Sequence, residues 1–177
     1  MQNPTPRIPQ QPAPNHRAEY DAGLTDELAA VVTSARRRAL RDGDRQIDTA
    51  HLLHSLIESD PAVREAFDGG PQLARVLGYL VQRSIGYGLR WQGAVEDSGA
   101  VPVVTEPGAE GWSPSAASAM ADAAFRAEAD GRERAGGLDL LAALAADRES
   151  RAVEVLARAG VDPALLADRI VEASGRA

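Results

Sequence analysis

The sequence LTDELAAVVTSARRRALRDGD, at residues 24–44, has a counterpart 88 positions later, WSPSAASAMADAAFRAEADG, at residues 112–131. Both stretches begin with a hydroxyl residue, Thr25 or Ser113, of the type that caps helix N-termini. Both continue with apolar residues at spacings of three and four, which predicts a helix with one buried face. Both reach a glycine, which commonly ends a helix. The two stretches therefore predict two equivalent long helices.

The correspondence between the two halves continues beyond these helices. The same shift aligns Leu52-Leu53 with Leu140-Leu141, and a slip of two more positions aligns Gly70 with Gly160. Chance similarity of two alanine-rich helices would match apolar positions, but it would not keep caps and glycines in step. The chain is therefore predicted to be a tandem duplication of one helical unit.

Cap residues, prolines and glycines divide each half into four predicted helices. In the first half, the expected helices start at Thr25, at Thr49, at Asp60-Pro61 and, after the break at Gly69-Gly70-Pro71, at Gln72, the last running to Arg90. In the second half, the expected starts are Ser113-Pro114, the residue after Gly136-Gly137, residue 149 and Asp162-Pro163. The predicted fold class is all-α.

Composition shifts give the predicted domain boundaries. Residues 1–22 are rich in proline and glutamine with almost no apolar content, so we predict a disordered tail. The two repeats and the segment between them are predicted at residues 23–90, 112–174 and 91–111, respectively.

The segment between the repeats has two equally good interpretations. It is either an irregular linker or a small β-hairpin, with Trp91–Val95 and Val101–Thr105 as the strands. Pro102 would restrict the second strand to an edge. In either case we expect the acidic pair Glu96-Asp97 to be solvated.

The composition excludes several classes of function. All nineteen basic residues of the 177 are arginine, so a P-loop, Schiff-base or kinase-type lysine is absent. The absence of cysteine excludes a disulfide, a thiol nucleophile and a zinc ribbon. The net charge of −7 disfavours a general affinity for nucleic acid or anionic membranes. Because no apolar run could span a bilayer or act as a signal core, we expect a cytoplasmic protein.

The order of the motifs resembles the Clp N-terminal (repeat) domain family, found at the front of ClpC-type AAA+ unfoldases. Each family repeat opens with an aromatic residue and threonine, and a Gly-Thr-Glu-His-hydrophobic-Leu-Leu stretch follows the long helix. Here that second stretch reads IDTAHLLHSLI at 47–57 and GGLDLLAALAAD at 136–147, and SRAVEVLARAGVD at 150–162 is similar to the family's repeat ending. The resemblance implies an all-α, pseudo-twofold domain of two four-helix repeats.

The resemblance also implies a function. In the family the domain is a docking platform for substrates, degrons and adaptors, and ATP is hydrolysed elsewhere in the chain. This sequence contains no G-x-x-x-x-G-K-[ST] motif, so we expect a free-standing, non-catalytic binding module without a cofactor. Expected partners are Clp unfoldase or protease components, adaptors and client peptides, including cyclic peptides. An adaptor, a competitor of adaptors and a peptide sink remain equally open.

The family's opening positions give the candidate peptide-binding residues, which are Leu24, Thr25, Trp112 and Ser113. A binding role predicts an exposed apolar patch near Leu24 and Trp112. Trp112 fits two roles equally well, a staple that packs on the following turn or an anchor for a peptide.

Other residues stand at the family's glutamate positions in this chain. The glutamate of the Thr-Glu-His motif, which belongs to the phosphoarginine pockets of some members, is Ala50 in the first repeat and Leu138 in the second. Without that carboxylate nothing pairs with a guanidinium, so we do not expect phosphoarginine recognition.

Two histidines are weighed as metal ligands. His51 and His54 lie three residues apart, but we expect no metal, because no acidic or histidine partner has a matching spacing. His51 occupies the family's structural histidine position, and Asp139 is its equivalent in the second repeat.

Basic residues on and just after the first long helix support the main alternative function. They are Arg36, Arg37, Arg38, Arg41 and Arg45, and we expect a solvated face paired with nearby aspartates. The alternative is a small regulatory protein that binds nucleic acid through this face, which would show steep salt dependence. An enzyme is not expected, since no G-x-S-x-G motif accompanies the serines.

Overall fold

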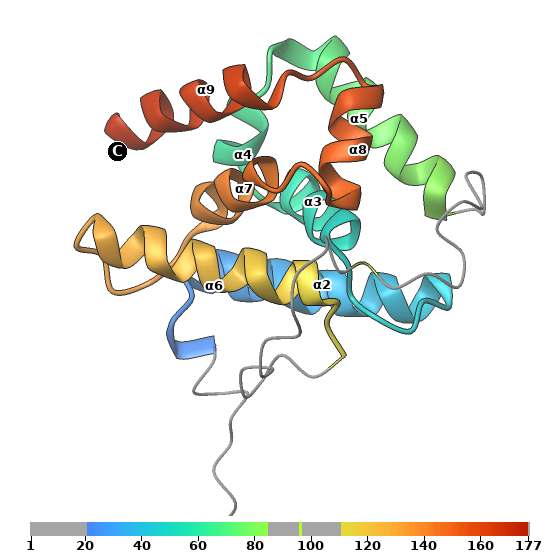
Figure 1. The fold of residues 1–177 in the computed structure, drawn as a ribbon, viewed down its shortest axis with the longest axis horizontal. Helices are drawn as coiled ribbons and strands as arrows, with labels where there is room; N and C mark the ends of the chain where they lie inside the picture. Colours follow the sequence, from blue (N-terminus) through green and yellow to red (C-terminus); the bar gives the residue numbers. More distant parts are fainter. Residues whose placement is uncertain (1–20, 85–95, 97–110, 177) are drawn as a thin grey trace, which may run out of the picture.

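The computed structural model describes residues 21–84, 96 and 111–176. The helices within these residues form two sets of four (Figure 1). The first set is α2 (Asp26–Asp42), α3 (Thr49–Ser59), α4 (Pro61–Glu65) and α5 (Gly69–Ser84). The second set is α6 (Pro114–Ala129), α7 (Gly137–Ala146), α8 (Arg151–Arg158) and α9 (Pro163–Gly175). The described residues contain isolated β-bridges but no strand, so the all-α prediction is confirmed.

Side-chain caps fix the helix starts, as the sequence predicts. Thr25 Oγ1 accepts a hydrogen bond from the Leu28 amide at 3.2 Å, and Ser113 Oγ accepts one from the Ala116 amide at 3.1 Å. Each hydroxyl thereby satisfies one of the amides that a helix N-terminus leaves without a partner. Aspartate caps followed by proline start α4 and α9 in the same way.

Four predicted helix starts are wrong by one to three residues. Two of them lie in the second half, where α7 begins at Gly137 and not after it, and α8 begins at Arg151 and not at residue 149. Thr49 is the first residue of α3 and its cap is Asp48, because Asp48 and His51 form a reciprocal capping box. The predicted start of α5 at Gln72 is also wrong, since the helix begins at Gly69. There the side chain of Gln72 reaches back and accepts a hydrogen bond from the Asp68 amide at 2.8 Å.

Several predicted features lie outside the described residues. These are residues 1–20 of the tail, both candidate hairpin strands and the end of the fourth helix after Ser84.

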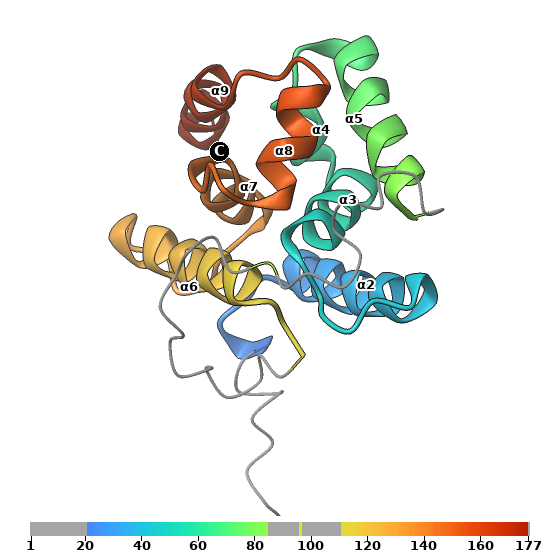
Figure 2. The same cartoon turned by 45° about the vertical axis from the view of Figure 1, so that its right-hand side comes forward.

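The helices form layers that place α3 and α7 at the centre. In both ribbon views α2 and α6 make the lower layer, α3 and α7 lie above them, and the remaining helices surround the top (Figures 1 and 2). The central helices are almost fully buried. Equivalent leucines of the two repeats are completely inaccessible, namely Leu52, Leu53 and Leu56 of α3 and Leu140, Leu141 and Leu144 of α7.

Two isolated β-bridges relate the repeats by a pseudo-twofold axis. Leu24 pairs with Ala135, and Trp112 pairs with Ile47. A shift of 88 positions converts one pair into the other, because it takes residue 24 to 112 and residue 47 to 135. The opening residue of each repeat is therefore held by the other repeat, and the two units form one interlocked domain.

No helix in the described part of the chain is both long and apolar enough to cross a membrane.

Candidate functional site

The predicted exposed patch at the repeat openings is wrong. Leu24 and Trp112 are each only 5% exposed. The reason is the pair of cross-repeat bridges, which draw both residues into the interface between the repeats. Of the two roles considered for Trp112, packing is the one that the structure shows, and any peptide contact by Leu24 or Trp112 would require them to leave the core.

The two hydroxyl candidates lie in different surroundings. Thr25 is partly exposed and caps α2. Ser113 is fully buried and, besides capping α6, donates a hydrogen bond from Oγ to Glu96 Oε1 at 2.9 Å. The structure therefore does not gather the four candidates into one site, and it places Ser113 in a polar cluster around Glu96.

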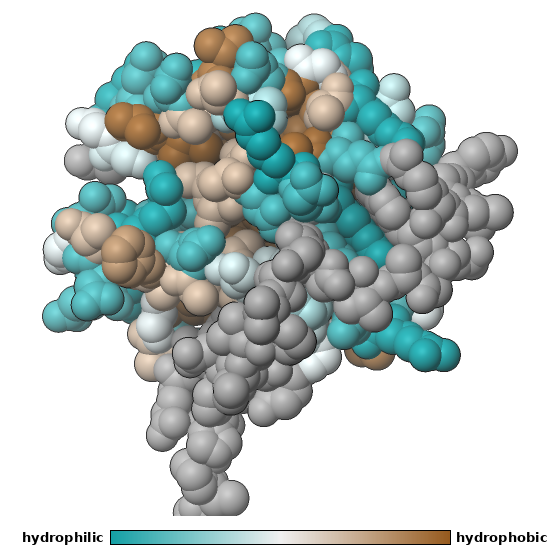
Figure 3. All heavy atoms as spheres, in the orientation of Figure 1, coloured by the Kyte–Doolittle hydropathy of each residue, from teal (hydrophilic) through white to brown (hydrophobic). Residues whose placement is uncertain are grey.

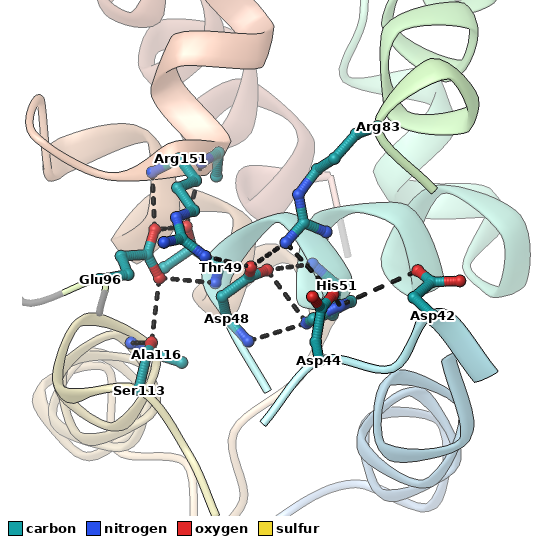
Figure 4. A network of polar contacts seen from close by, with 11 residues as sticks. Asp42, Asp44, Asp48, Thr49, His51, Arg83, Glu96, Ser113, Ala116 and Arg151 are labelled. Carbon is teal, nitrogen blue, oxygen red and sulfur yellow. Dashed lines mark hydrogen bonds and ion pairs between the residues drawn. The ribbon is translucent and has the colours of Figure 1, made fainter. Parts of the chain in front are cut away.

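The expectation that Glu96 is solvated is also wrong. This residue is only 5% exposed, and its carboxylate lies where α3, α6 and α8 begin (Figure 4). Oε1 accepts from the Thr49 amide at 2.9 Å, and Oε2 accepts from the Arg151 amide at 2.6 Å. Thr49 Oγ1 donates to Oε2 as well. Together with Ser113, these groups give the carboxylate four donors, which offset the loss of its hydration.

A second buried carboxylate, that of Asp48, lies beside the Glu96 cluster. Asp48 Oδ2 pairs with the guanidinium groups of Arg83 and Arg151, the latter at 2.9 Å. Burial opposes ionisation of Asp48, but the hydrogen bond and charge of His51 and the charge of Arg83 outweigh it. They hold the pKa of Asp48 well below its ordinary value. The negative charge of Asp48 is therefore compensated within the cluster.

His51 has acidic neighbours that the sequence analysis did not anticipate. Its Nε2 lies 2.7 Å from Asp44 Oδ2 and 4.0 Å from Asp42 Oδ2, so the expectation of no acidic partner is wrong. The three residues Asp42, Asp44 and His51 place ligand-type atoms within 4.8 Å of one another. Burial opposes protonation of His51, but its hydrogen bonds with Asp44 and Asp48 outweigh this and raise its pKa.

The hydrogen bonds of His51 argue against metal coordination. In the neutral ring, Nδ1 accepts from the Asp48 amide at 2.9 Å, so the proton is on Nε2, which donates to Asp44. Protonation adds a hydrogen to Nδ1, which then faces Asp48 Oδ1 at 3.1 Å. In both states Nε2 keeps its proton and offers no lone pair to a metal. The ring acts as a cap and an ion-pair partner.

The second repeat contains the same arrangement with reversed charge. Arg132 and Asp139 lie 88 positions after Asp44 and His51, and the guanidinium binds the carboxylate with two hydrogen bonds of 2.6 Å. Asp139 also accepts from the Gly136 amide at 2.8 Å. Asp139 thus replaces His51 in both of its contacts, which supports a structural role for this position in each repeat.

The counterpart of the Glu96 cluster in the other half lacks its donors. The residues equivalent to Thr49 and Arg151 are Gly137, which has no hydroxyl, and Pro61, which has no amide hydrogen. A Cβ added to Gly137 would overlap Asp60 Oδ2, so the Asp60 carboxylate fills the space taken by the Thr49 side chain in the first half. Only one of the two pseudo-equivalent positions is a four-donor cluster.

Comparison with known proteins agrees with this architecture. No protein-family model and no curated protein matches the sequence. The solved structures that match include the N-terminal domain of the caseinolytic protease-associated chaperone ClpD from Arabidopsis thaliana. That match has a TM-score of 0.58 at 18% sequence identity, and it covers 85% of this chain and 93% of the other. The chain has the Clp N-domain fold. The resemblance noted in the motifs is therefore confirmed at the level of the fold.

Within this Clp N-domain fold, the arginine-rich face is smaller than expected. Arg38 is 8% exposed and forms an ion pair with Glu58, so its guanidinium is not part of a solvated face. Arg37, Arg41 and Arg45 are exposed. Glu58 also accepts from His54, whose pKa falls to about 4 because burial and the nearby Arg38 charge disfavour its protonated form.

The apolar surface of the domain lies over other helices than predicted. Phe125 of α6 is 70% exposed, and Leu165 and Val171 of α9 are 61% and 65% exposed. Figure 3 shows apolar surface where α6, α7 and α9 lie, with a hollow between α6 and α9 at the left-hand edge. A pocket of about 180 Å³ that Leu165 lines lies at the start of α9. The sequence signal for this surface is Phe125, which replaces the equivalent Arg37 of α2.

Proposed function

We propose that this protein is a non-catalytic peptide- or protein-binding module of the Clp protease system, acting as an adaptor, a modulator or a peptide sink. The observation that carries the proposal is the extent of the structural match. It takes in nearly all of the ClpD N-terminal domain, which belongs to a chaperone associated with the caseinolytic protease, and most of this chain. Clp unfoldase or protease components, their adaptors and their client peptides are therefore the proposed partners.

The surface over α6 and α9 is the proposed docking face. Exposed aromatic and branched side chains gathered on one face of a domain are typical of protein interaction sites. Phe125 on α6 and Leu165 and Val171 on α9 are exposed apolar side chains, whereas Leu24 and Trp112 are packed inside. A tryptophan-to-alanine variant at the repeat opening would test folding rather than docking.

The test measures binding and degradation with purified components. A ClpC-type unfoldase is immobilised, binding of this protein is measured by interferometry, and degradation of a fluorescent model substrate is followed with the peptidase present. We expect saturable binding that falls about tenfold or more in Phe125→Asp. The matched control is Leu40→Asp, since Leu40 is 75% exposed but lies on α2.

The degradation assay separates the three roles. An adaptor accelerates degradation of particular clients, a competitor slows it, and a sink binds free peptides without binding the unfoldase. Absence of binding to the unfoldase and to peptides, with no effect on degradation, would overturn the proposal.

A further inference from the structure

An exposed aromatic side chain on α6 lies among acidic and small residues. Phe125 is 70% exposed, and Asp122 and Glu128 are exposed three residues before and after it, on the same side of the helix. Ala121 and Ala129, four residues away in each direction, are exposed as well. These five residues are called the acidic face, which offers one aromatic ring flanked by two carboxylates.

An exposed leucine on α2 lies among basic residues. Leu40 is 75% exposed, two arginines precede it by three and four residues, and a third follows it directly. This group is called the basic face and consists of Arg36, Arg37, Leu40 and Arg41. Asp44, which follows the helix, is paired with His51 and Arg83 and is therefore engaged elsewhere. The basic face thus offers one apolar side chain beside three positive charges.

The charges of the two faces have no partners within the described part of the chain. No hydrogen bond or ion pair joins any of their charged side chains to another described residue, and Arg36 Nε is inaccessible without a hydrogen-bond partner. Arg38, the other arginine of this run, is paired with Glu58 instead. The charges of both faces can therefore bind an oppositely charged surface without the loss of an existing ion pair.

The two faces match each other residue by residue. A shift of 88 positions takes Arg37 to Phe125 and Leu40 to Glu128, so each repeat has a charge where the other has its large apolar side chain. If α2 of one copy crosses α6 of another in the antiparallel sense with Leu40 on Phe125, the equal three-residue spacing places Arg37 opposite Glu128. The same register brings Arg41 towards Asp122. Apolar and charged contacts are thus satisfied together.

One molecule cannot join its own two faces. Both ribbon views show α2 and α6 running in opposite directions, so their C-terminal ends point to opposite sides of the domain (Figures 1 and 2). Leu40 and Phe125 lie in the C-terminal halves of these helices. A contact between the faces must therefore join two copies, and each copy in the pair keeps one face unoccupied. Contacts of this heterologous kind extend into larger assemblies.

We propose that this protein self-associates head to tail, with the basic face of one copy bound to the acidic face of the next. The partner at each face is a second copy of this chain. This inference goes beyond the proposed function and does not rest on it. Because Phe125 also belongs to the proposed docking face, a bound copy covers part of that face.

The association is weak and depends on salt. Two crossed helices bury an area at the low end of protein–protein interfaces, so the dissociation constant is on the order of 0.1 mM. Sodium chloride screens the exposed charges that the contact brings together, so association weakens as the salt concentration rises.

The first experiment is sedimentation velocity of the full chain after nuclease treatment. The protein is measured from about 10 µM to 1 mM, which spans the expected dissociation constant. In about 50 mM sodium chloride we expect the average mass to rise past that of a dimer, and in about 500 mM to fall towards the monomer. A monomer at every concentration in low salt would overturn the proposal, and so would association that disappears with the nuclease treatment.

The second experiment separates the two faces. Leu40→Asp removes the basic face's apolar contact and Phe125→Asp that of the acidic face, so each variant keeps one face intact. We expect each variant alone to associate about tenfold or more weakly, and their equimolar mixture to form a one-to-one dimer that does not grow. In the mixture, amide resonances should shift on α6 of ¹⁵N-labelled Leu40→Asp and on α2 of ¹⁵N-labelled Phe125→Asp. The matched control is Leu165→Asp, an exposed leucine on α9, which should associate as the wild type does.

The outcomes distinguish this contact from others. Undiminished association of Leu40→Asp or Phe125→Asp alone would indicate contact between two identical faces and overturn the head-to-tail arrangement, as would a mixture that stays monomeric. If either aspartate variant fails to fold, Arg37→Glu or Glu128→Arg replaces it, since both change exposed charges. No Clp component takes part, so failure of the proposed function is seen separately. Leu40→Asp should lose self-association and keep its binding to the unfoldase.

Discussion

Replacing Gly137 by alanine tests a close approach between the two repeats. Gly137 is the first residue of α7, and a Cβ there would overlap Asp60 Oδ2 and lie 3.1 Å from Asp60 Cγ and 3.3 Å from Val63 Cγ2. The carboxylate would have to turn away, yet Asp60 Oδ1 caps α4 by accepting from the Ala62 amide at 2.9 Å. The mutation therefore disturbs α4 through the cap of a helix in the other repeat.

The expected effect combines three contributions. Loss of the α4 cap destabilises by about 1 kcal/mol, and crowding against Val63 adds about 1–3 kcal/mol. The alanine's better helix propensity offsets up to about 1 kcal/mol. We expect Gly137→Ala to lower the free energy of unfolding by about 1–4 kcal/mol, measured by urea denaturation followed by circular dichroism.

A control of opposite sign is available in α5. Gly78 is exposed and a Cβ there meets nothing within 4 Å, so Gly78→Ala should raise the free energy of unfolding by about 0.5–1 kcal/mol. Asp60→Ala removes most of the clash at position 137. The loss of unfolding free energy in the double variant Asp60→Ala, Gly137→Ala should therefore be about 1 kcal/mol smaller than the sum of the losses in the two single variants. Equal stability of the Gly137 and Gly78 variants, or strict additivity with Asp60→Ala, would refute the reasoning.

The remaining predictions concern the core and the ion pairs. Trp112→Ala should lower the free energy of unfolding by about 3–5 kcal/mol, because the indole is almost inaccessible; a loss under about 1 kcal/mol in urea would contradict its burial. The folded pKa of His54 is about 4, below the unfolded value of 6.5, so its contribution to stability is present above pH 6.5 and is lost as pH falls from 6.5 towards 4. Urea midpoints across that range should depend less on pH in His54→Asn than in the wild type. Asp139→His should lower the melting temperature, because it removes the carboxylate that pairs with Arg132. Adding Arg132→Asp should raise the melting temperature again, because it rebuilds the aspartate–histidine pair that the first repeat has in Asp44 and His51.

The fold could be predicted because its signals are local and occur twice. Thr25 and Ser113 show their capping role within one turn of helix, and glycines and prolines mark the breaks in both halves. The burial of Trp112 depends instead on its bridge to Ile47, which comes from the other repeat and has no local signal. Position in the family motif suggested exposure, and pairing across the repeats decided the outcome.

The Glu96 cluster could not have been found from spacing. Glu96 sits between glycine, serine and aspartate residues typical of a solvated turn, and its donors are three residues on three helices. One sequence signal was present, because Thr49 and Ser113 are hydroxyl residues at helix starts that only the tertiary fold brings together. Hydroxyl groups at a helix start can hold an anion as well as cap the helix, and Ser113 does both.

The two repeats have diverged at the junctions where their helices begin. A duplication begins with two equal junctions, and each junction here contains a carboxylate from the chain itself. In one half, Asp60 lies beside Gly137, which has no hydroxyl where the other half has Thr49. Pro61 of the same half has no amide hydrogen where the other half has Arg151. In the other half, Thr49, Ser113 and Arg151 keep all four donors around Glu96. Asp60 caps α4 through its Oδ1, whereas the Glu96 carboxylate accepts from the first amides of α3 and α8. The pseudo-twofold scaffold therefore binds a buried carboxylate with four donors at one junction only, because a glycine and a proline at the other junction remove a hydroxyl and an amide hydrogen.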